Sequence, residues 1–154
     1  MTSALAARPR PRLSRRFRLV ITAVVAVVAL GLSACTPESR AALDMINNTR
    51  SLNGRAAVQF HVDLWYKAQG WSDQLMRDQY LHHSNLADGV GHLPWRKLGE
   101  NIAVAGSIAD AHNAFMGSKG HRDNILDPAF THAAVGVSRD GTGRYWVVQV
   151  FMRL

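Results

Sequence analysis

Two histidines and a glutamate, in three segments far apart in the sequence, are the side chains best suited to chemistry. His83 stands before a serine, Glu100 lies in the run Gly99-Glu100-Asn101-Ile102, and His121 follows the break between two glycines in residues 117–126. Imidazole nitrogens and a carboxylate can hold a metal ion or transfer protons, provided that each group reaches one cavity from a different element. The residue types therefore favour a shared site at His83, Glu100 and His121.

The helices that must position these groups begin upstream. Ser39 is predicted to cap a helix over residues 40–50 that stops at Asn53-Gly54, and Asp63 is predicted to cap a second helix. The apolar residues of this second helix recur at the spacing of one helical face. They are Leu64, Ala68, Trp71 and Leu75. The second helix runs out just before His83, at a point where a side chain can face a cavity.

A strand and a further helix separate the first histidine from the second. Residues 98–104 are predicted to form a short strand that carries Glu100 near its start. Ser107, with Asp110 three residues later, nearly matches a capping box and predicts the start of a helix that closes at Gly117. Glu100 and His121 would then approach the site from different elements.

The C-terminal part of the chain has the pattern of a hairpin. Asp127-Pro128 should end the short helix that contains His121, because proline disfavours the helical conformation of the residue before it. Residues 135–137 and 145–152 then surround a turn at 140–143. Both alternating sets of side chains are mostly apolar, which predicts strands that are buried on both faces.

Five segments of the sequence, taken in order, resemble the motifs of the CAP superfamily of cysteine-rich secretory proteins, antigen 5 and pathogenesis-related proteins. They are His83-Ser84, Gly99-Glu100-Asn101-Ile102-Ala103, Ser118-x-Gly120-His121-Arg122-x-Asn124-Ile125-Leu126, Phe130-Thr131-His132-Ala133-Ala134-Val135-Gly136-Val137 and Tyr145-Trp146-Val147-Val148-Gln149-Val150-Phe151. The similarity covers roughly residues 41–154 and is closest to the bacterial SCP-like extracellular branch. It implies an α+β fold, an α-β-α sandwich with a small antiparallel sheet between helical layers, over a CAP domain at residues 40–154.

The resemblance also implies a cavity lined by His83, Glu100, Ser118 and His121. Animal and plant members have a second glutamate where this sequence has Ser118, so the His-Glu-Glu-His set is incomplete here. CAP proteins bind zinc through the two histidines, which implies a weak divalent-metal site at His83 and His121 with water in the open positions and Glu100 directed toward that water.

Two classes of function remain open from the sequence. A hydrolase would use metal-bound or Glu100-activated water, with His121 as proton donor, on an ester or amide bond; Ser118 fits a turn residue better than a nucleophile, since no orienting carboxylate accompanies it. The sequence contains no His-Glu-x-x-His and no Gly-x-Ser-x-Gly motif. The competing class, which the resemblance favours, is a module that binds a lipid, an envelope component or a partner protein.

The positive charge of the chain lies almost wholly at its N-terminal end. The chain has 18 basic and 11 acidic residues, a net charge of +7, but residues 1–34 hold six arginines and no acidic residue. The remainder has 12 basic against 11 acidic residues, a net charge of +1. No electrostatic footprint for phosphate remains, so we expect no nucleic-acid partner.

The basic head and the apolar run at residues 19–32 are typical of a signal peptide, predicted here to cover residues 1–34. Leu32-Ser33-Ala34-Cys35 resembles the lipobox of bacterial lipoproteins, in which the cysteine is acylated before cleavage. Cys35 is the only cysteine of the chain, so the exported domain can form no internal disulfide. We therefore expect a lipid anchor on Cys35, a short tether at residues 35–39 and a location on the extracytoplasmic face of the cell membrane. Export by the Sec or the twin-arginine route stays open.

Overall fold

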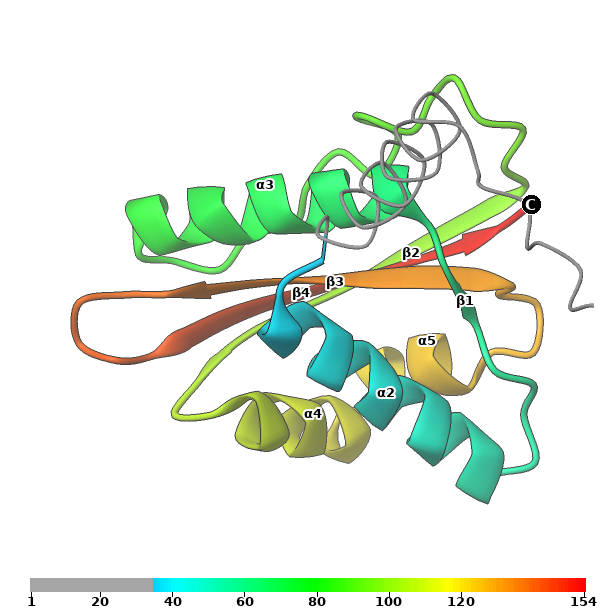
Figure 1. The fold of residues 1–154 in the computed structure, drawn as a ribbon, viewed down its shortest axis with the longest axis horizontal. Coiled ribbons are helices and arrows are strands. Elements are labelled where there is room, and N and C mark those ends of the chain that lie inside the picture. Colours follow the sequence, from blue (N-terminus) through cyan, green and yellow to red (C-terminus); the bar gives the residue numbers. More distant parts are fainter. Residues whose placement is uncertain (1–34) are drawn as a thin grey trace, which may run out of the picture. The chain divides into compact units, whose positions relative to one another are not determined.

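The computed structural model describes residues 35–154, which form four helices around a four-stranded sheet. The predicted signal peptide, residues 1–34, lies outside the described residues. The elements, in chain order, are α2 (Pro37–Leu52), β1 (Gln59–Phe60), α3 (Val62–Asp78), β2 (Lys97–Ala105), α4 (Ile108–Gly117), α5 (Lys119–Leu126), β3 (His132–Arg139) and β4 (Tyr145–Arg153). Helix α3 covers one face of the sheet, and α2, α4 and α5 cover the other (Figure 1). The predicted α-β-α sandwich is confirmed.

The sheet has the order β1-β3-β4-β2. Strands β3 and β4 form the predicted hairpin, and β2 pairs antiparallel with β4 along its whole length, from Lys97 opposite Arg153 to Ala105 opposite Tyr145. The two-residue strand β1 runs parallel to β3. The prediction of a purely antiparallel sheet is therefore wrong at this edge. The chain leaves α2 and passes alongside β3, in the same direction, before it enters α3.

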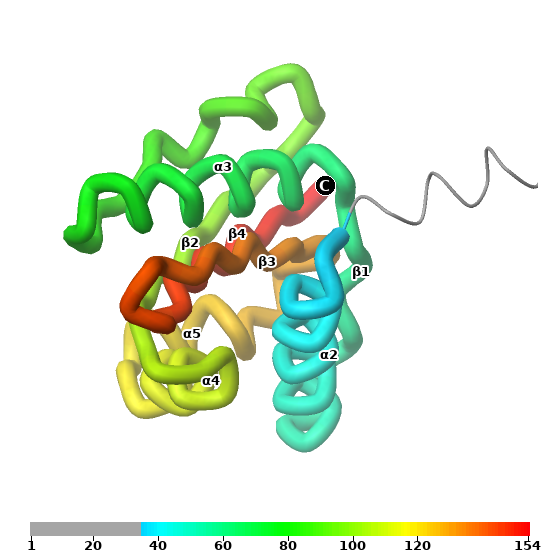
Figure 2. The backbone as a smooth tube through the Cα atoms, turned by 60° about the vertical axis from the view of Figure 1, so that its left-hand side comes forward, coloured from blue at the N-terminus to red at the C-terminus, as the bar shows by residue number. Residues whose placement is uncertain are grey.

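Two apolar cores lie on the two faces of the sheet. Figure 2 shows from a second direction that α3 lies on one side of the strands and that α2, α4 and α5 lie on the other. On the α2, α4 and α5 side, Val147 and Phe151 of β4 pack with Ile46 and Phe115. On the α3 side, alternate residues of β4 pack with the helix stripe. They are Trp146, Val148, Val150 and Met152, against Leu64, Ala68 and Leu75. The prediction that the hairpin is buried on both faces is confirmed.

The start of α2 differs from the prediction. Thr36, not Ser39, is the N-cap, because its side chain accepts a hydrogen bond from the backbone N–H of Ser39 at 3.1 Å. Pro37 occupies the first turn, where its missing N–H leaves no hydrogen bond unmade. Residues 37–39 are thus helical, and the predicted tether at 35–39 is reduced to Cys35 and Thr36.

The other helix boundaries are largely as predicted. His61 caps α3 through its ring nitrogen instead of Asp63, which lies in the first turn. Ser107 caps α4 by accepting from the N–H of Asp110 at 3.0 Å, as predicted. Helix α5 ends at Leu126, directly before Asp127-Pro128. Within residues 35–154, no helix combines the length and the apolar composition needed to cross a bilayer.

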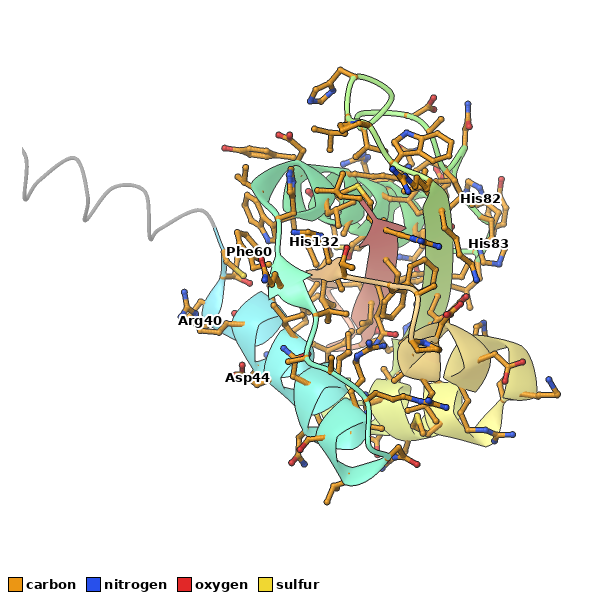
Figure 3. The ribbon with its side chains drawn as sticks, turned by 90° about the vertical axis from the view of Figure 1, so that its right-hand side faces the viewer. Arg40, Asp44, Phe60, His82, His83 and His132 are labelled. Atoms are coloured by element: carbon orange, nitrogen blue, oxygen red, sulfur yellow. The ribbon has the colours of Figure 1, made fainter. Side chains whose placement is uncertain are left out.

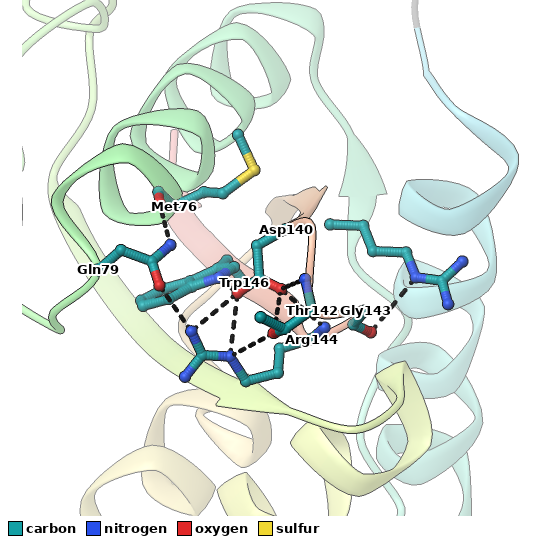
Figure 4. Close-up of polar contacts among 8 residues, drawn as sticks. Met76, Gln79, Asp140, Thr142, Gly143, Arg144 and Trp146 are labelled. Atoms are coloured by element: carbon teal, nitrogen blue, oxygen red, sulfur yellow. Dashed lines mark hydrogen bonds and ion pairs between the residues drawn. The ribbon is translucent and has the colours of Figure 1, made fainter.

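The tip of the hairpin is fastened to the end of α3 (Figure 4). Asp140 accepts hydrogen bonds from the side chains of Thr142 and Trp146, and these bonds hold the pKa of Asp140 well below its usual range. Arg144 pairs with Asp140 and donates to Oε1 of Gln79 at 2.6 Å. Gln79 is the C-cap of α3 and has a left-handed backbone, with φ of 58°. The turn therefore orients the last turn of α3, from which the chain continues to His83.

Candidate functional site

The carboxylate of Glu100 is enclosed by the segment that follows α3. Its side chain is only 1% exposed. One oxygen, Oε1, accepts from the backbone N–H of Ser84 at 2.9 Å and lies 2.8 Å from Nδ1 of His83, while Oε2 accepts from the Ser84 hydroxyl at 2.6 Å. Both oxygens thus take part in hydrogen bonds with residues 83 and 84. The direction of Glu100 toward metal-bound water stays a prediction.

The imidazole of His83 is held at one nitrogen and open at the other. Its side chain is 61% exposed, although Nδ1 contacts the buried Glu100. In the neutral ring, Nδ1 must carry the proton that it shares with the carboxylate, which leaves the lone pair on Nε2. A carboxylate behind a histidine is the usual arrangement for fixing the tautomer and orientation of a ligand. The structure therefore leaves Nε2 of His83 without a hydrogen-bond partner among residues 35–154, on a side chain that is exposed to solvent.

Lys67 of α3 supports this arrangement and was missed in the sequence. Its ammonium group donates to the Ser84 hydroxyl at 3.0 Å and to the backbone carbonyl of Asn85 at 2.8 Å. Burial lowers the pKa of Lys67, and the Glu100 carboxylate acts in the opposite direction. Lys67 brings a positive charge toward the buried carboxylate through one intervening hydroxyl. The apolar spacing of the second predicted helix indicates only that Lys67 lies outside the buried stripe. No feature of the sequence connects Lys67 with Ser84.

His121 lies in the first turn of α5, with its ring edge-on to Phe115 at a centroid distance of 5.3 Å. Burial lowers the pKa of His121, and a positive charge on His83 lowers it further. The structure brings His83, in the segment after α3, into contact with Glu100 of β2, and it places His121 in α5. The convergence of His121 with these two residues stays a prediction.

Buried amides fix the backbone of α5 against the sheet. The side-chain N–H₂ of Asn101, next to Glu100, donates to the backbone carbonyl of His121 at 3.0 Å and to Oε1 of Gln149 at 2.9 Å. Asn124 donates to Oδ1 of Asn101 at 2.9 Å. Because Asn101 and Gln149 are almost fully buried, these bonds are shielded from water. The motif residues Asn101 and Asn124 thus position His121, and Gln149 was a third member that alternation alone did not reveal.

Ser118 occupies the junction between α4 and α5. Its backbone N–H bonds to the carbonyls of Ala114 and Phe115, and its side chain forms no capping bond to α5. Within the described chain Ser118 makes no hydrogen bond with His83, Glu100 or His121, which agrees with its interpretation as a turn residue. Its place in the cavity stays a prediction.

The donor set fits a metal site of two histidines and no more. Nε2 of His83 is free of hydrogen bonds within residues 35–154, and the lowered pKa of His121 favours the neutral imidazole that metals bind. Among the described residues, no three His, Cys, Asp or Glu side chains lie together as a metal-binding group. With the carboxylate of Glu100 already occupied, any ion held here would rely on two nitrogens and water, which gives low affinity.

The sequence model of the cysteine-rich secretory protein family, CAP, matches residues 43–151. The chain belongs to the CAP family. Two curated relatives of the chain come from Bacillus subtilis: the uncharacterized membrane protein YlbC, 31% identical over 114 residues, and the uncharacterized protein YkwD, 27% identical over 118 residues. These alignments cover 68% and 71% of this chain but only 32% and 46% of the relatives, so the chain spans less than half of their length.

Solved structures of bacterial proteins show the same fold. An extracellular protein with an SCP domain from Bacillus anthracis has a TM-score of 0.67 and 26% identity, over 76% of this chain and 40% of that one. A cysteine-rich secretory protein from Staphylococcus aureus has a TM-score of 0.66 and 17% identity, over 76% and 38% of the two chains. The predicted fold and family are confirmed, and the bacterial relatives of this CAP domain include extracellular and membrane proteins.

Proposed function

We propose that this CAP domain is exported, anchored to the cell membrane by lipid on Cys35, and acts at the cell envelope as a module that binds a ligand or a partner protein. The observation that carries this proposal is the enclosure of Glu100, whose two carboxylate oxygens are occupied by His83 and Ser84. A general base must reach the water that it activates. Glu100 instead orients the exposed imidazole of His83 toward a partner.

The alternative function, a hydrolase, has less support. Glu100 offers no free oxygen, and Ser118 stands where many relatives of the superfamily carry a second glutamate. Water activation would then fall to a metal ion or to His121 alone. A neutral imidazole at His121 can accept a proton, but no carboxylate is hydrogen-bonded to it within residues 35–154 to orient it as a base.

Recovery of a bound compound distinguishes the two classes. The purified anchored protein is incubated with an extract of cell envelope, with and without chelator, and is then washed. Denaturation releases the bound compounds, which are identified by mass spectrometry. A binding module should return one compound class chemically unchanged. Progressive loss of that compound with appearance of its hydrolysis products would establish the alternative, and its suppression by chelator would assign the reaction to metal-bound water.

The proposed metal site is weak and uses both histidines. Zinc titration by calorimetry should give an affinity that falls by about tenfold or more in His83→Ala and in His121→Ala, because each removes one of two nitrogen ligands. His82→Ala is the matched control, since His82 is adjacent in sequence but pairs with Asp78 and stacks on Tyr80. The control should bind zinc as the unchanged protein does. Equal affinity in all four proteins would refute the site.

The proposed anchor depends on the thiol of Cys35. Cys35→Ser should remain at the mass of the unprocessed precursor, because lipoprotein signal peptidase acts only after the cysteine is acylated. Mass spectrometry of the N-terminal peptide and membrane fractionation measure this directly. Ser33→Ala, which keeps a small residue in the motif, should be processed normally. Normal processing and membrane retention of Cys35→Ser would show that the anchor has been misassigned.

A further inference from the structure

An exposed apolar surface lies at the N-terminal end of α3 and on the neighbouring strand β1. Phe60 is 42% exposed, Val62 is 40% exposed and Tyr66 is 62% exposed. Val62 and Tyr66 are four residues apart in α3, so they lie on one face of the helix. With the half-buried Trp65, whose ring centroid is 5.1 Å from that of Tyr66, these residues form what we name the aromatic surface. Grouped apolar side chains of this kind commonly mark a contact site.

The aromatic surface adjoins the point at which the anchor would leave the domain. The indole Nε1 of Trp65 donates to the hydroxyl of Ser39 at 3.4 Å, in the first turn of α2. Burial raises the pKa of the Cys35 thiol, while Arg40 and a hydrogen bond with the Ser39 side chain act in the opposite direction. The Ser39 hydroxyl also accepts a hydrogen bond at 3.0 Å from the hydroxyl of Thr36, the residue after Cys35, so Trp65 lies close to the point at which the anchor would join the domain. Figure 3 shows Phe60 and Arg40 on this same side of the molecule.

Very few residues separate the proposed anchor at Cys35 from the folded domain. Only Thr36 separates Cys35 from the first helical residue, which allows a reach of roughly 7 Å at about 3.5 Å per residue. A lipid on Cys35 would hold the beginning of α2 within that distance of the headgroups. Tyr and Trp side chains are favoured at this depth, because their rings are apolar and their polar atoms stay hydrated.

Apolar contact, not charge, would dominate the interaction with lipid. Arg40 can attract an anionic headgroup, but Glu38 and Asp44 of the same helix oppose it. A contact through the rings of Tyr66 and Phe60 should therefore change little with salt concentration. A purely electrostatic contact would weaken as salt is added.

We propose that the aromatic surface of Phe60, Val62, Trp65 and Tyr66 rests in the headgroup region of the membrane that holds Cys35. This inference rests on the proposed lipid anchor. His83 lies on the side of the domain opposite Phe60 and Arg40 (Figure 3), so the candidate site faces away from the bilayer. In this orientation, His83 meets partners that approach from the aqueous side.

Spin labels on the anchored protein test this orientation. Because Cys35 is the only cysteine, Tyr66→Cys or Val62→Cys supplies a single free thiol when Cys35 is acylated. Lys119→Cys is the matched control, since Lys119 is 81% exposed at the start of α5, which lies on the far side of the sheet from α3. The labelled proteins are placed in vesicles of phosphatidylcholine and phosphatidylglycerol, and collision of each nitroxide with a water-soluble nickel chelate is measured.

The collision rate at positions 62 and 66 should be lower by about threefold or more in the vesicle-bound protein than in the same protein in solution without lipid, at low and at high salt. The collision rate at position 119 should be the same in both states. Equal collision at 66 and 119 in vesicles, or spin–spin broadening at 66 that reveals a second copy, would overturn the proposal. Uptake of label by the protein without an added cysteine would expose a free Cys35 thiol. That result overturns the anchor, and this inference with it.

Discussion

Gly136→Ala is expected to lower the free energy of unfolding by about 3 kcal/mol and the melting temperature by about 10 °C. A Cβ atom at Gly136 of β3 would lie 2.1 Å from the carbonyl oxygen of Ala68 and 2.4 Å from the backbone nitrogen of Gln69, both in α3. Backbone atoms inside a helix cannot move aside as a flexible side chain can. The helix would have to shift away from the sheet, and the buried contacts of Leu64 and Leu75 would loosen with it.

Gly70→Ala is the matched control for this prediction. Gly70 lies in α3 itself, is exposed, and a Cβ atom there would have no neighbour within 4 Å. Alanine is the better helix former by about 1 kcal/mol, so this variant should be more stable than the unchanged protein. Thermal unfolding followed by circular dichroism measures both. Similar melting temperatures for the two variants would show that α3 does not approach β3 as closely as described.

The fold could be predicted from the sequence more completely than the helix caps and the shortest strand could. Burial determines the periodic pattern of a whole element, and many residues contribute to it. Examples are the apolar stripe of α3, with Leu64, Ala68 and Leu75, and the alternation along β4. A cap depends on one side chain, and Thr36 and Ser39 are equally good capping types. Only the fold decides that Thr36 accepts the bond while Ser39 turns inward. Strand β1, with two residues, is too short to show alternation.

The candidate site was predictable only where the family motifs reach it. Those motifs named His83, Glu100 and His121, and the structure brings His83 and Glu100 into contact. Lys67 lies outside these motifs, and Gln149 lies in one of them, but the motif did not reveal its contact with Asn101. Their roles depend on which helix and which strand face Ser84 and Asn101, and that is a property of the tertiary packing.

The anchor and the site together define how this CAP domain would work. In the proposed lipid-anchored form, α2 would start two residues after the anchor, which would leave the domain little freedom to turn over on the membrane and keep His83 on the side opposite Phe60. A domain held in one orientation would suit the proposed module that presents a fixed surface to a partner. The orientation of the His83 ring, which Glu100 holds, would then be the feature on which the proposed binding depends.

Glu100→Ala is expected to cost about 3 kcal/mol of stability and to weaken zinc binding by roughly 10- to 100-fold. The substitution leaves the N–H of Ser84, Nδ1 of His83 and the ammonium group of Lys67 without the buried carboxylate that they surround. The imidazole of His83 would lose its fixed orientation, and in the neutral ring the proton would no longer be held on Nδ1. Nitrogen NMR of the His83 ring, thermal unfolding and zinc titration report the three effects separately.

Glu100→Gln separates the effect of the hydrogen bonds made by Glu100 from the effect of its negative charge. A glutamine keeps one carbonyl oxygen that can accept from both Ser84 and Nδ1 of His83, and its N–H₂ group can donate to the Ser84 hydroxyl. It retains the shape and the hydrogen bonds but carries no negative charge and cannot act as a base. We therefore expect Glu100→Gln to restore most of the zinc affinity and the Nδ1-protonated ring that Glu100→Ala loses. If glutamine and alanine were equally damaging, the negative charge of Glu100, and not only its hydrogen bonds, would be required to hold the His83 ring and the zinc.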